Sequence, residues 1–486
     1  FSGRDSLFFS YTLLLVVYFY MQKGEGRSEN KKTNIYRILK TSFFLVPLGL
    51  LPLIKGSALF LCLGMDFLFF AYFFFYKRIN YAVICILVPF CSNIFFWMIA
   101  GQNLSCLPDF YINMLPMISG YSEAMAKEGS FGQVLLFIIT ALVMLSTILL
   151  FQKKIKSFET LFLILGIVLF LFLSFKSGFV RHDGHAMSAA NGLLFASLVL
   201  CVIYEREFLI FPFLLSLFCW IFIDVSYNTT TTKVIVERLK NTYVNSFEGL
   251  TDRIGNPHSL AASYKNSLDK IQQQIKIPIL SGSTDIYTVD QSYLIASDNQ
   301  WNPRPVFQSY SVYEPKLAMI NERHLRSEKA PDHIIFNMHT IDDRFPTLDD
   351  GISWLALFDN YQATDYVNSN ILFQKKSVVK RESSLVSLAE KKCRIGEKVV
   401  LTASSNILFA EIDLKPTLLG RMMGVVYKMP TLDLLVKFDN GKEKKFRTVS
   451  KMMKTGFIIS PYIQNTDQFA TFLLDPDKKQ TPSIAS

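Results

Sequence analysis

Long apolar segments crowd into the first 225 residues of the chain, and the remaining residues have an ordinary mixed pattern. A transmembrane helix needs about 20 mostly apolar residues to cross roughly 30 Å of hydrocarbon. Eight segments approach or reach that length. We therefore expect an all-α membrane bundle of about eight helices, at 6–21, 41–54, 57–76, 80–100, 133–151, 158–175, 187–204 and 207–225.

Positive charge alternates between the loops that join these segments. The loops after the first, third, fifth and seventh segments hold 12 Lys and Arg residues, whereas the other loops and the N-terminal stub hold five. The positive-inside rule assigns the first set to the cytoplasm. This orientation predicts that the loops 101–132 and 176–186, and the whole chain after residue 225, lie outside the cytoplasm.

The second half of the chain predicts a folded exoplasmic region in two parts. Residues 226–396 alternate helical and strand-like patterns, which indicates an α/β domain. Residues 397–476 carry short alternating runs, with an Asn-Gly turn in "DNGKEKKF", and predict a small β-sandwich. The boundaries are thus 1–225 for the membrane domain, 226–396, 397–476, and a tail at 477–486 whose composition is typical of disorder.

Composition limits the classes of partner and cofactor. The 486 residues have a net charge of +10, but no basic patch is interleaved with aromatic residues, so we expect membrane lipid and no nucleic acid as a partner. The seven cysteines form no CxxC or Cys/His spacing. We predict no cofactor and no metal site, although a divalent metal is compatible with the acids and histidines below. The first residue is Phe, so we expect the chain to continue upstream.

The stretch "FKSGFVRHDGH" holds the densest group of candidate chemical residues, namely Lys176, Arg181, His182, Asp183 and His185. A short loop on the side that the positive-inside rule depletes of cations favours a site. Lys176 and Arg181 suit a phosphate group, and the two histidines and the carboxylate suit acid–base catalysis. The alternative is that the cations are anchors at lipid headgroups and the histidines are solvated.

Two further carboxylates in the membrane half have open roles. Glu123, in "GYSEAM", follows an apolar run in the loop 101–132 and is a candidate base that would activate an acceptor hydroxyl. The alternative is an ordinary amphipathic surface helix. Asp66 lies within an apolar segment, where a charge is costly, and would point to transport if it lined a cavity; the alternative is a protonated or hydrogen-bonded packing residue.

In the exoplasmic region, the run "NQWNPRPVFQSYSVY" combines aromatic, Arg and amide side chains, which often bind sugars. Trp301, Arg304 and Tyr310 are the candidates for binding an acceptor, with rigid packing of a Pro-flanked loop as the alternative. The sequence has no GxSxG, Walker, HExxH or GxGxxG motif in a suitable context, so hydrolase, nucleotide-binding and zincin functions lack support.

The layout resembles the GT-C class of glycosyltransferases that use lipid-linked sugars, and it is similar to that of O-antigen polymerases and ligases. The phrases "WNPRPVFQSYSVYEPKLAMIN" and "ISGYSEAM" look like those of large, uncharacterised bacterial membrane proteins. The resemblance is architectural and assigns no catalytic residue. It implies a multi-pass protein of the bacterial inner membrane with a periplasmic C-terminal domain.

These observations predict a glycosyltransferase. It would move a sugar from a polyprenyl-phosphate-linked donor to a glycan or protein acceptor at the outer face of the membrane. A scaffold for envelope assembly and a transporter of lipid-linked glycans are the alternatives, because fold-level analogy is weak support for activity.

Overall fold

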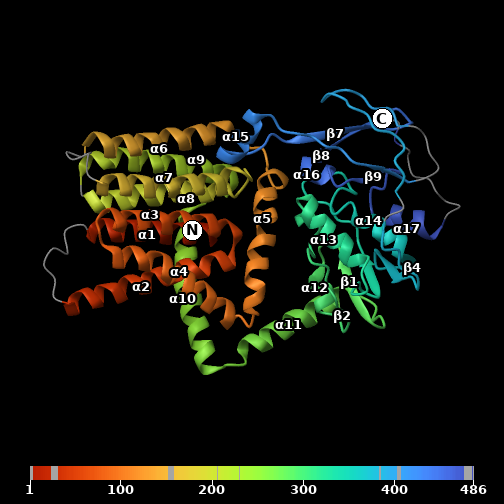
Figure 1. Ribbon diagram of the computed structural model, residues 1–486, viewed down its shortest axis with the longest axis horizontal. Coiled ribbons are helices and arrows are strands. Elements are labelled where there is room, and N and C mark those ends of the chain that lie inside the picture. Colours follow the sequence, from red (N-terminus) through yellow and green to blue (C-terminus); the bar gives the residue numbers. More distant parts are fainter. Residues whose placement is uncertain are drawn as a thin grey trace. The chain divides into compact units, whose positions relative to one another are not determined.

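A computed structural model describes residues 4–22, 31–151, 158–204, 206–228, 230–382, 385–401, 407–475 and 484 (Figure 1). The chain divides into two compact units. Unit 1 comprises Phe1–Ile235 together with Leu418–Met429, and unit 2 comprises Val236–Thr417 together with Pro430–Ser486. A short segment from late in the chain therefore belongs to the unit built by its first half.

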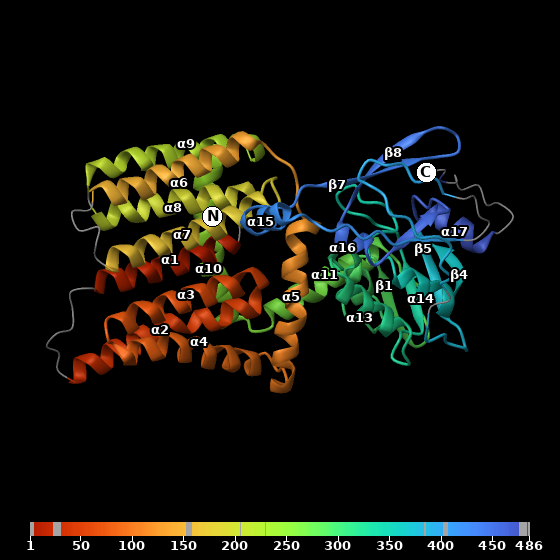
Figure 2. The same ribbon diagram turned by 45° about the horizontal axis from the view of Figure 1, so that its top comes forward.

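Unit 1 is a bundle of apolar helices (Figure 2). Its main helices are α1 (Arg4–Met21), α2 (Lys31–Ile54), α3 (Gly56–Phe75), α4 (Ile79–Ile99), α5 (Leu107–Ala124), α6 (Phe131–Phe151), α7 (Phe158–Phe179), α8 (Ala186–Tyr204) and α9 (Ile210–Tyr227). Seven of the helices in the described residues are long and apolar enough to cross a membrane, and Ser6–Met21 is a shorter apolar helix. All eight expected segments are thus helical, and a multi-pass membrane protein is supported.

The second segment is longer than expected. We placed its start at residue 41, whereas α2 begins at Lys31 and its apolar part runs from Asn34 to Ile54. It contains Pro47 and Pro52, whose missing N–H groups leave two gaps in the ladder of helical hydrogen bonds. Lipid-spanning helices tolerate such gaps when neighbouring groups supply partners.

Small residues let α7 approach its neighbour closely. A Cβ atom added at Gly178 would lie 2.7 Å from the Cβ of Ala189 in α8, and one added at Gly192 would lie 2.5 Å from the hydroxyl of Ser174. Membrane helices associate through such contacts because lipid offers no hydrophobic driving force between them. The loop that joins α7 to α8 is therefore held by a tightly packed helix pair.

The core of unit 2 is a mixed five-stranded sheet in the order β2-β1-β3-β5-β4. Its strands are β1 (Ser283–Tyr287), β2 (Gln300–Trp301), β3 (His333–Phe336), β4 (Tyr361–Val367) and β5 (Asn370–Lys375). β1 pairs in parallel with β2 and β3, while β5 is antiparallel to β3 and β4. The helices α13 (Pro315–Leu325) and α14 (Ser353–Asn360) follow β2 and β3 in the chain.

Two long helices precede this sheet. They are α10 (Thr232–Gly255) and α11 (Ser259–Gln274), and neither has a buried residue. A shorter helix, α12 (Gln291–Ile295), follows β1.

The expected β-sandwich at 397–476 is not confirmed. The described residues there form two separate two-stranded sheets, β6 (Leu408–Ala410) with β9 (Phe457–Ser460) and β7 (Leu432–Lys437) with β8 (Glu443–Thr448). The predicted Asn-Gly hairpin is present between β7 and β8, and Gly441 has the positive φ of +80° that such a turn requires.

Two of the short alternating runs in the region 397–476, where the β-sandwich is expected, are helices, and the described part of a third run is not a strand. "GRMMGVVYK" lies mostly in α15 (Leu418–Val426), and "FATFLL" lies in α17 (Thr466–Leu474); a short α16 (Ser450–Met453) precedes β9. The strand expected at 398–405 falls partly outside the described residues, and its described part, 398–401, is not a strand. Short apolar runs do not distinguish a buried strand from a helix.

The final elements pack into the core of unit 2. Phe469 in α17 makes ring contacts with Phe336 of β3 and Trp354 of α14. Ile458 of β9 belongs to the same buried cluster. The tail expected at 477–486 lies outside the described residues except for Ile484, which is buried and bridges to Phe438.

Candidate functional site

The loop between α7 and α8 lies against the loop between α5 and α6. The backbone N–H of Lys127 donates to the carbonyl of Val180 (3.0 Å), and that of His182 donates to the carbonyl of Lys127 (3.3 Å). Lys127 and Arg181 thus form a parallel bridge. Two segments about fifty residues apart in sequence are joined by their backbones at one end of the bundle.

Asp183 is the centre of the charged group on this surface. Its carboxylate accepts hydrogen bonds from Arg181 Nε (3.1 Å), from His185 Nδ1 (2.6 Å) and from the backbone N–H of His185 (3.1 Å). Lys127 Nζ lies 4.0 Å away. Burial opposes ionisation, but the hydrogen bonds from His185 and the charge of Arg181 outweigh it, so the pKa of Asp183 is lower than usual.

Of this group, His185 has the most accessible side chain, which is 54% exposed. Asp183 holds its Nδ1, which fixes the ring and leaves the opposite nitrogen, Nε2, to act on a substrate. A histidine oriented by a carboxylate is the arrangement that general bases commonly use. His185 and Asp183, which are separate candidates in the sequence, are hydrogen-bonded to each other in the structure.

His182 is different, because its side chain is buried. Its Nε2 lies 2.8 Å from the amide oxygen of Gln133, which also accepts from the hydroxyl of Tyr227 (3.2 Å). That oxygen can only accept, so His182 carries its proton on Nε2. Its Nδ1 is buried and has no hydrogen-bond partner in the part of the chain that the structure describes. Burial and the nearby charge of Lys428 lower the pKa of His182 to about 4, so the ring is neutral at pH 7.

Lys176 is committed to a contact that the sequence did not predict. Its ammonium group donates to the carbonyls of Gly424 (2.9 Å) and Val425 (3.0 Å) at the end of α15. These are the carbonyls that a helix C-terminus leaves unpaired, and a cation there is favourable. Lys176 therefore holds α15, which argues against the phosphate role that we expected for it.

Glu123 and Asp66 occupy separate places in unit 1. Glu123 is half-buried in the last turn of α5, four residues before Lys127. Asp66 is buried within α3, and its Oδ1 atom has no hydrogen-bond partner among the described residues. A hollow lined by Phe19, Tyr72 and Glu159 lies near the C-terminal end of α3 and the N-terminal end of α7. The α7–α8 loop, which carries the charged group around Asp183, follows the other end of α7.

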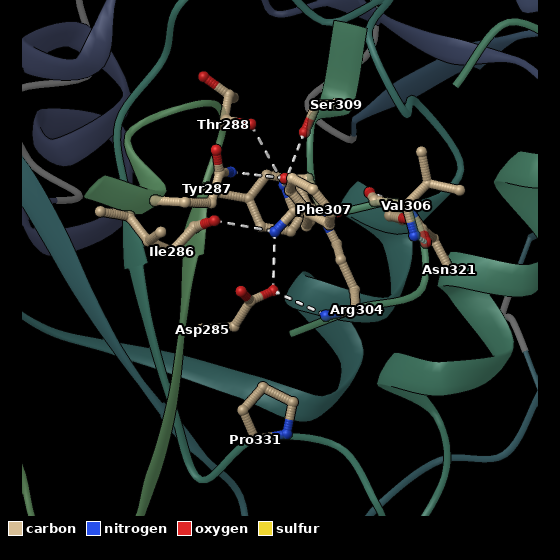
Figure 3. A network of polar contacts seen from close by, with 12 residues as sticks. Asp285, Ile286, Tyr287, Thr288, Arg304, Val306, Phe307, Ser309, Asn321 and Pro331 are labelled. Atoms are coloured by element: carbon tan, nitrogen blue, oxygen red, sulfur yellow. Dashed lines mark hydrogen bonds and ion pairs between the residues drawn. The ribbon is translucent and has the colours of Figure 1, made fainter. Parts of the chain in front are cut away.

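In unit 2, Arg304 is fully buried in a polar network (Figure 3). One terminal nitrogen donates to Asp285 (2.7 Å) and to the carbonyl of Ile286 (2.9 Å). The other donates to the carbonyl of Phe307 (2.9 Å) and to the hydroxyl of Ser309 (3.0 Å). These bonds use the four terminal N–H groups. The Nε–H has no hydrogen-bond partner among the described residues but is buried like the rest of the side chain, so no N–H group of Arg304 is exposed to an acceptor molecule.

Further groups enclose the same guanidinium. It stacks 3.6 Å from the ring centroid of Tyr287, and Asp350 Oδ2 lies 3.9 Å from its Nε. Asp350 in turn accepts from Tyr287 (2.7 Å) and Asn321 (2.9 Å). Burial raises the pKa of Asp350 to about 6 despite these partners. The network joins the loop 302–309 to β1, α13 and the start of α14.

The other two expected acceptor-binding residues also make internal contacts. The indole of Trp301 donates to Asp285 (3.2 Å), the same carboxylate that Arg304 binds. The hydroxyl of Tyr310 donates to Gln308 (2.8 Å), and its carbonyl accepts from Arg344 (3.1 Å). Both side chains are half-buried, so the geometry favours the packing alternative for this loop.

Sequence reasoning missed several residues that build the charged loop. Gln133, Tyr227 and Lys127 contact the α7–α8 loop, and the Lys428 ammonium donates to the carbonyl of Lys127 (2.6 Å). A glutamine at the start of a membrane span was a signal for Gln133, whereas nothing local in the sequence marked Lys428. Within the described parts of the chain, no cluster of three or more His, Cys, Asp or Glu residues could hold a metal ion.

Comparison with known proteins gives no family. No protein-family model, no curated protein and no solved structure matches the chain.

Proposed function

We propose that this protein is a glycosyltransferase of the bacterial inner membrane that acts on polyprenyl-phosphate-linked sugars at the outer face. The pairing of His185 with Asp183, beside Arg181, at the exposed end of the helix bundle carries this proposal. In this proposal His185 is the base, and Arg181, in the same loop, is the cation that binds the phosphate of the lipid-linked donor.

The reaction assigns a role to each group. His185 Nε2 takes the proton from the acceptor hydroxyl, and the acceptor oxygen forms a bond to the anomeric carbon of the sugar. The bond from that carbon to the phosphate oxygen breaks, and the phosphate leaves with the electron pair, facing Arg181 and Lys127. Asp183 keeps the ring of His185 oriented and stabilises its protonated form.

Some candidate residues have other roles in this proposal than the sequence analysis assigns to them. Lys176 and His182 are structural here, because each is committed to an internal partner. Glu123 remains a candidate base from sequence reasoning alone. Acceptor binding by unit 2 needs residues other than Arg304, whose side chain is fully buried.

Phosphate binding tests the proposal first. The full chain in lipid nanodiscs is titrated with undecaprenyl phosphate and, separately, with the neutral alcohol undecaprenol. We expect Arg181→Gln to weaken binding of the phosphate about tenfold or more, because a charge-assisted hydrogen bond contributes about 1.5–3 kcal/mol. Arg206→Gln is the matched control, since this exposed arginine follows the far end of α8.

Transfer is then followed with mixed polyprenyl-phosphate sugars as donors. His185→Gln should lower the release of polyprenyl phosphate by about 10²–10⁴-fold while binding persists, as the loss of a general base does. Equal phosphate binding by the wild type, Arg181→Gln and Arg206→Gln would overturn the proposal.

A non-catalytic assembly scaffold is the second candidate, and one observation favours it. His182 joins the α7–α8 loop to Gln133 in α6. Lys176 joins the end of α7 to α15, and Lys428 joins the segment after α15 to the α5–α6 loop, as a structural junction would. This candidate predicts that His185→Gln and Arg181→Gln leave the function of the protein in cells intact.

A further inference from the structure

The helix α15 exposes apolar side chains on most of its surface. Its sequence, LLGRMMGVV, includes one charged residue, Arg421, and none of its residues is buried. Six large apolar side chains are between 44% and 75% exposed: Leu418, Leu419, Met422, Met423, Val425 and Val426. A patch of this kind is unstable in water and marks a contact with lipid or protein.

The position of α15 within unit 1 indicates what covers it. Lys176 binds the carbonyls of Gly424 and Val425, and the ring of Tyr427 lies 5.4 Å from that of Phe175. Phe175 and Lys176 belong to the apolar span Phe158–Phe179. The C-terminal end of α15 therefore lies level with the last turns of a membrane-spanning helix, beside the α7–α8 end of the bundle in Figures 1 and 2.

We propose that α15 is an interfacial helix that inserts its apolar side chains into the lipid leaflet in which α7 ends. Nine residues rise only about 14 Å, which is too short to cross the bilayer but suits a helix that lies in its surface layer. Arg421 reaches the phosphate headgroups, and Tyr427 takes the interfacial position that aromatic residues favour.

The Lys176 contact fits this environment. A helix end that enters the apolar layer leaves carbonyl groups without water, and each unpaired group is costly there. Lys176 supplies two of the missing hydrogen bonds from within the protein. The proposal does not depend on the transferase activity, because it concerns how the chain meets the membrane after residue 417.

The inference gives the late segment a role in the architecture. Residues 418–429 interrupt unit 2, whose chain leaves at Thr417 and resumes at Pro430. The sequence pattern of 397–476 gave no sign of a membrane contact. An inserted α15 means that the chain touches the bilayer again, nearly two hundred residues after α9.

Spin labels measure the surroundings of α15 directly. Single cysteines replace Leu419, Met422 or Val425 in the full chain, in a background where the accessible native cysteines are replaced, and each variant carries a nitroxide in nanodiscs. Collision rates with oxygen, which concentrates in lipid, and with a nickel chelate, which stays in water, are compared. The accessible native cysteines are Cys91, Cys106, Cys201 and Cys393.

Two exposed positions calibrate the measurement. Phe67 in α3 is 70% exposed within a membrane span, and Ile395 in unit 2 is 83% exposed. We expect the oxygen-to-nickel ratio at the α15 positions to match that at Phe67 and to exceed that at Ile395 severalfold. A ratio like that at Ile395 would overturn the proposal by placing α15 in water. Low access to both reagents would also overturn it, in favour of a second copy or another protein.

Discussion

Two arginine–aspartate pairs in this protein have the same chemistry and different surroundings. Arg181 and Asp183 lie in a loop of unit 1, with side chains that are 19% and 25% exposed. Arg304 and Asp285 lie in the core of unit 2, with side chains that are 0% exposed. The sequence makes Arg181 a candidate for binding a phosphate and Arg304 a candidate for binding an acceptor, with packing as the alternative for Arg304.

The two pairs differ in which of their polar groups remain available to bind a substrate. Arg304 uses its terminal nitrogens on carbonyls, a hydroxyl and a carboxylate of its own unit, so it stabilises the loop 302–309. The carboxylate of Asp183 instead orients a histidine that is half exposed to solvent. Full burial with all terminal N–H groups paired indicates a structural role for Arg304, whereas the partly exposed, oriented ring of His185 leaves room for a substrate.

The largest effect should come from breaking the buried pair. Arg304→Gln leaves Asp285 and Asp350 without their cation in the core, and removing one member of a buried pair costs about 3–5 kcal/mol. Arg181→Gln should cost less than about 1 kcal/mol, because its pair is partly exposed. Hydrogen exchange in β1 and β3 measures the loss for Arg304→Gln, and exchange in the α7–α8 loop measures it for Arg181→Gln. Similar losses in both variants would contradict the comparison.

A second prediction concerns the stability of the α7–α8 loop at low pH. The pKa of His182 is lowered by burial to about 4 from its ordinary value of 6.5, so the folded loop binds this proton less tightly than the unfolded loop. The neutral ring of His182 makes its full contribution to the stability of the folded loop above pH 6.5. This contribution is lost as the pH falls toward 4, by about 3 kcal/mol at most. Hydrogen exchange of residues 180–185, corrected for the intrinsic effect of pH, measures it.

The control for the acid effect is His182→Gln, which cannot titrate in this range. Asp183 and Lys428 remain in both proteins, so their contributions cancel in the comparison. A loop in His182→Gln that loosens between pH 6.5 and 4 as much as the wild-type loop would rule out His182 as the cause.

The smallest predicted effect is a difference in stability between alanine variants of two glycines near His182. Gly129 is close to its ring in space, and Gly184 is close to it in sequence. A Cβ atom at Gly129 would lie 2.3 Å from the ring of His182, whereas one at Gly184 would meet nothing within 4 Å. Gly129→Ala should destabilise the loop by about 1–3 kcal/mol through overpacking, and Gly184→Ala should stay within about 0.5 kcal/mol. Thermal unfolding of the purified variants checks this, and equal losses would mean that His182 is not tightly packed.

Much of unit 1 follows from the sequence, because membrane helices are a local property. Apolar composition and length predict α3, α4 and α6 to α9 closely, since each helix satisfies its own backbone hydrogen bonds. The Asn-Gly hairpin between β7 and β8 was predictable for the same reason, as turn geometry depends on two neighbouring residues. The runs of 397–476 were harder, because α15 and α17 are too short for their periodicity to be decisive.

The candidate site was only partly predictable. Asp183 and His185 are two residues apart, so their pairing follows from local chain geometry. The commitment of Lys176 to Gly424 joins residues almost 250 positions apart, and the burial of Arg304 requires β1, α13 and α14 together. No local pattern encodes either contact.

The sequence by itself therefore determined where the apolar helices form and which loop concentrates ionisable residues. Only the tertiary structure decided which of those residues remain accessible, and that the segment 418–429 belongs with the membrane helices. The physical reason is that burial and hydrogen-bond pairing depend on neighbours that are distant in the chain, whereas helix formation in an apolar segment depends on the segment alone.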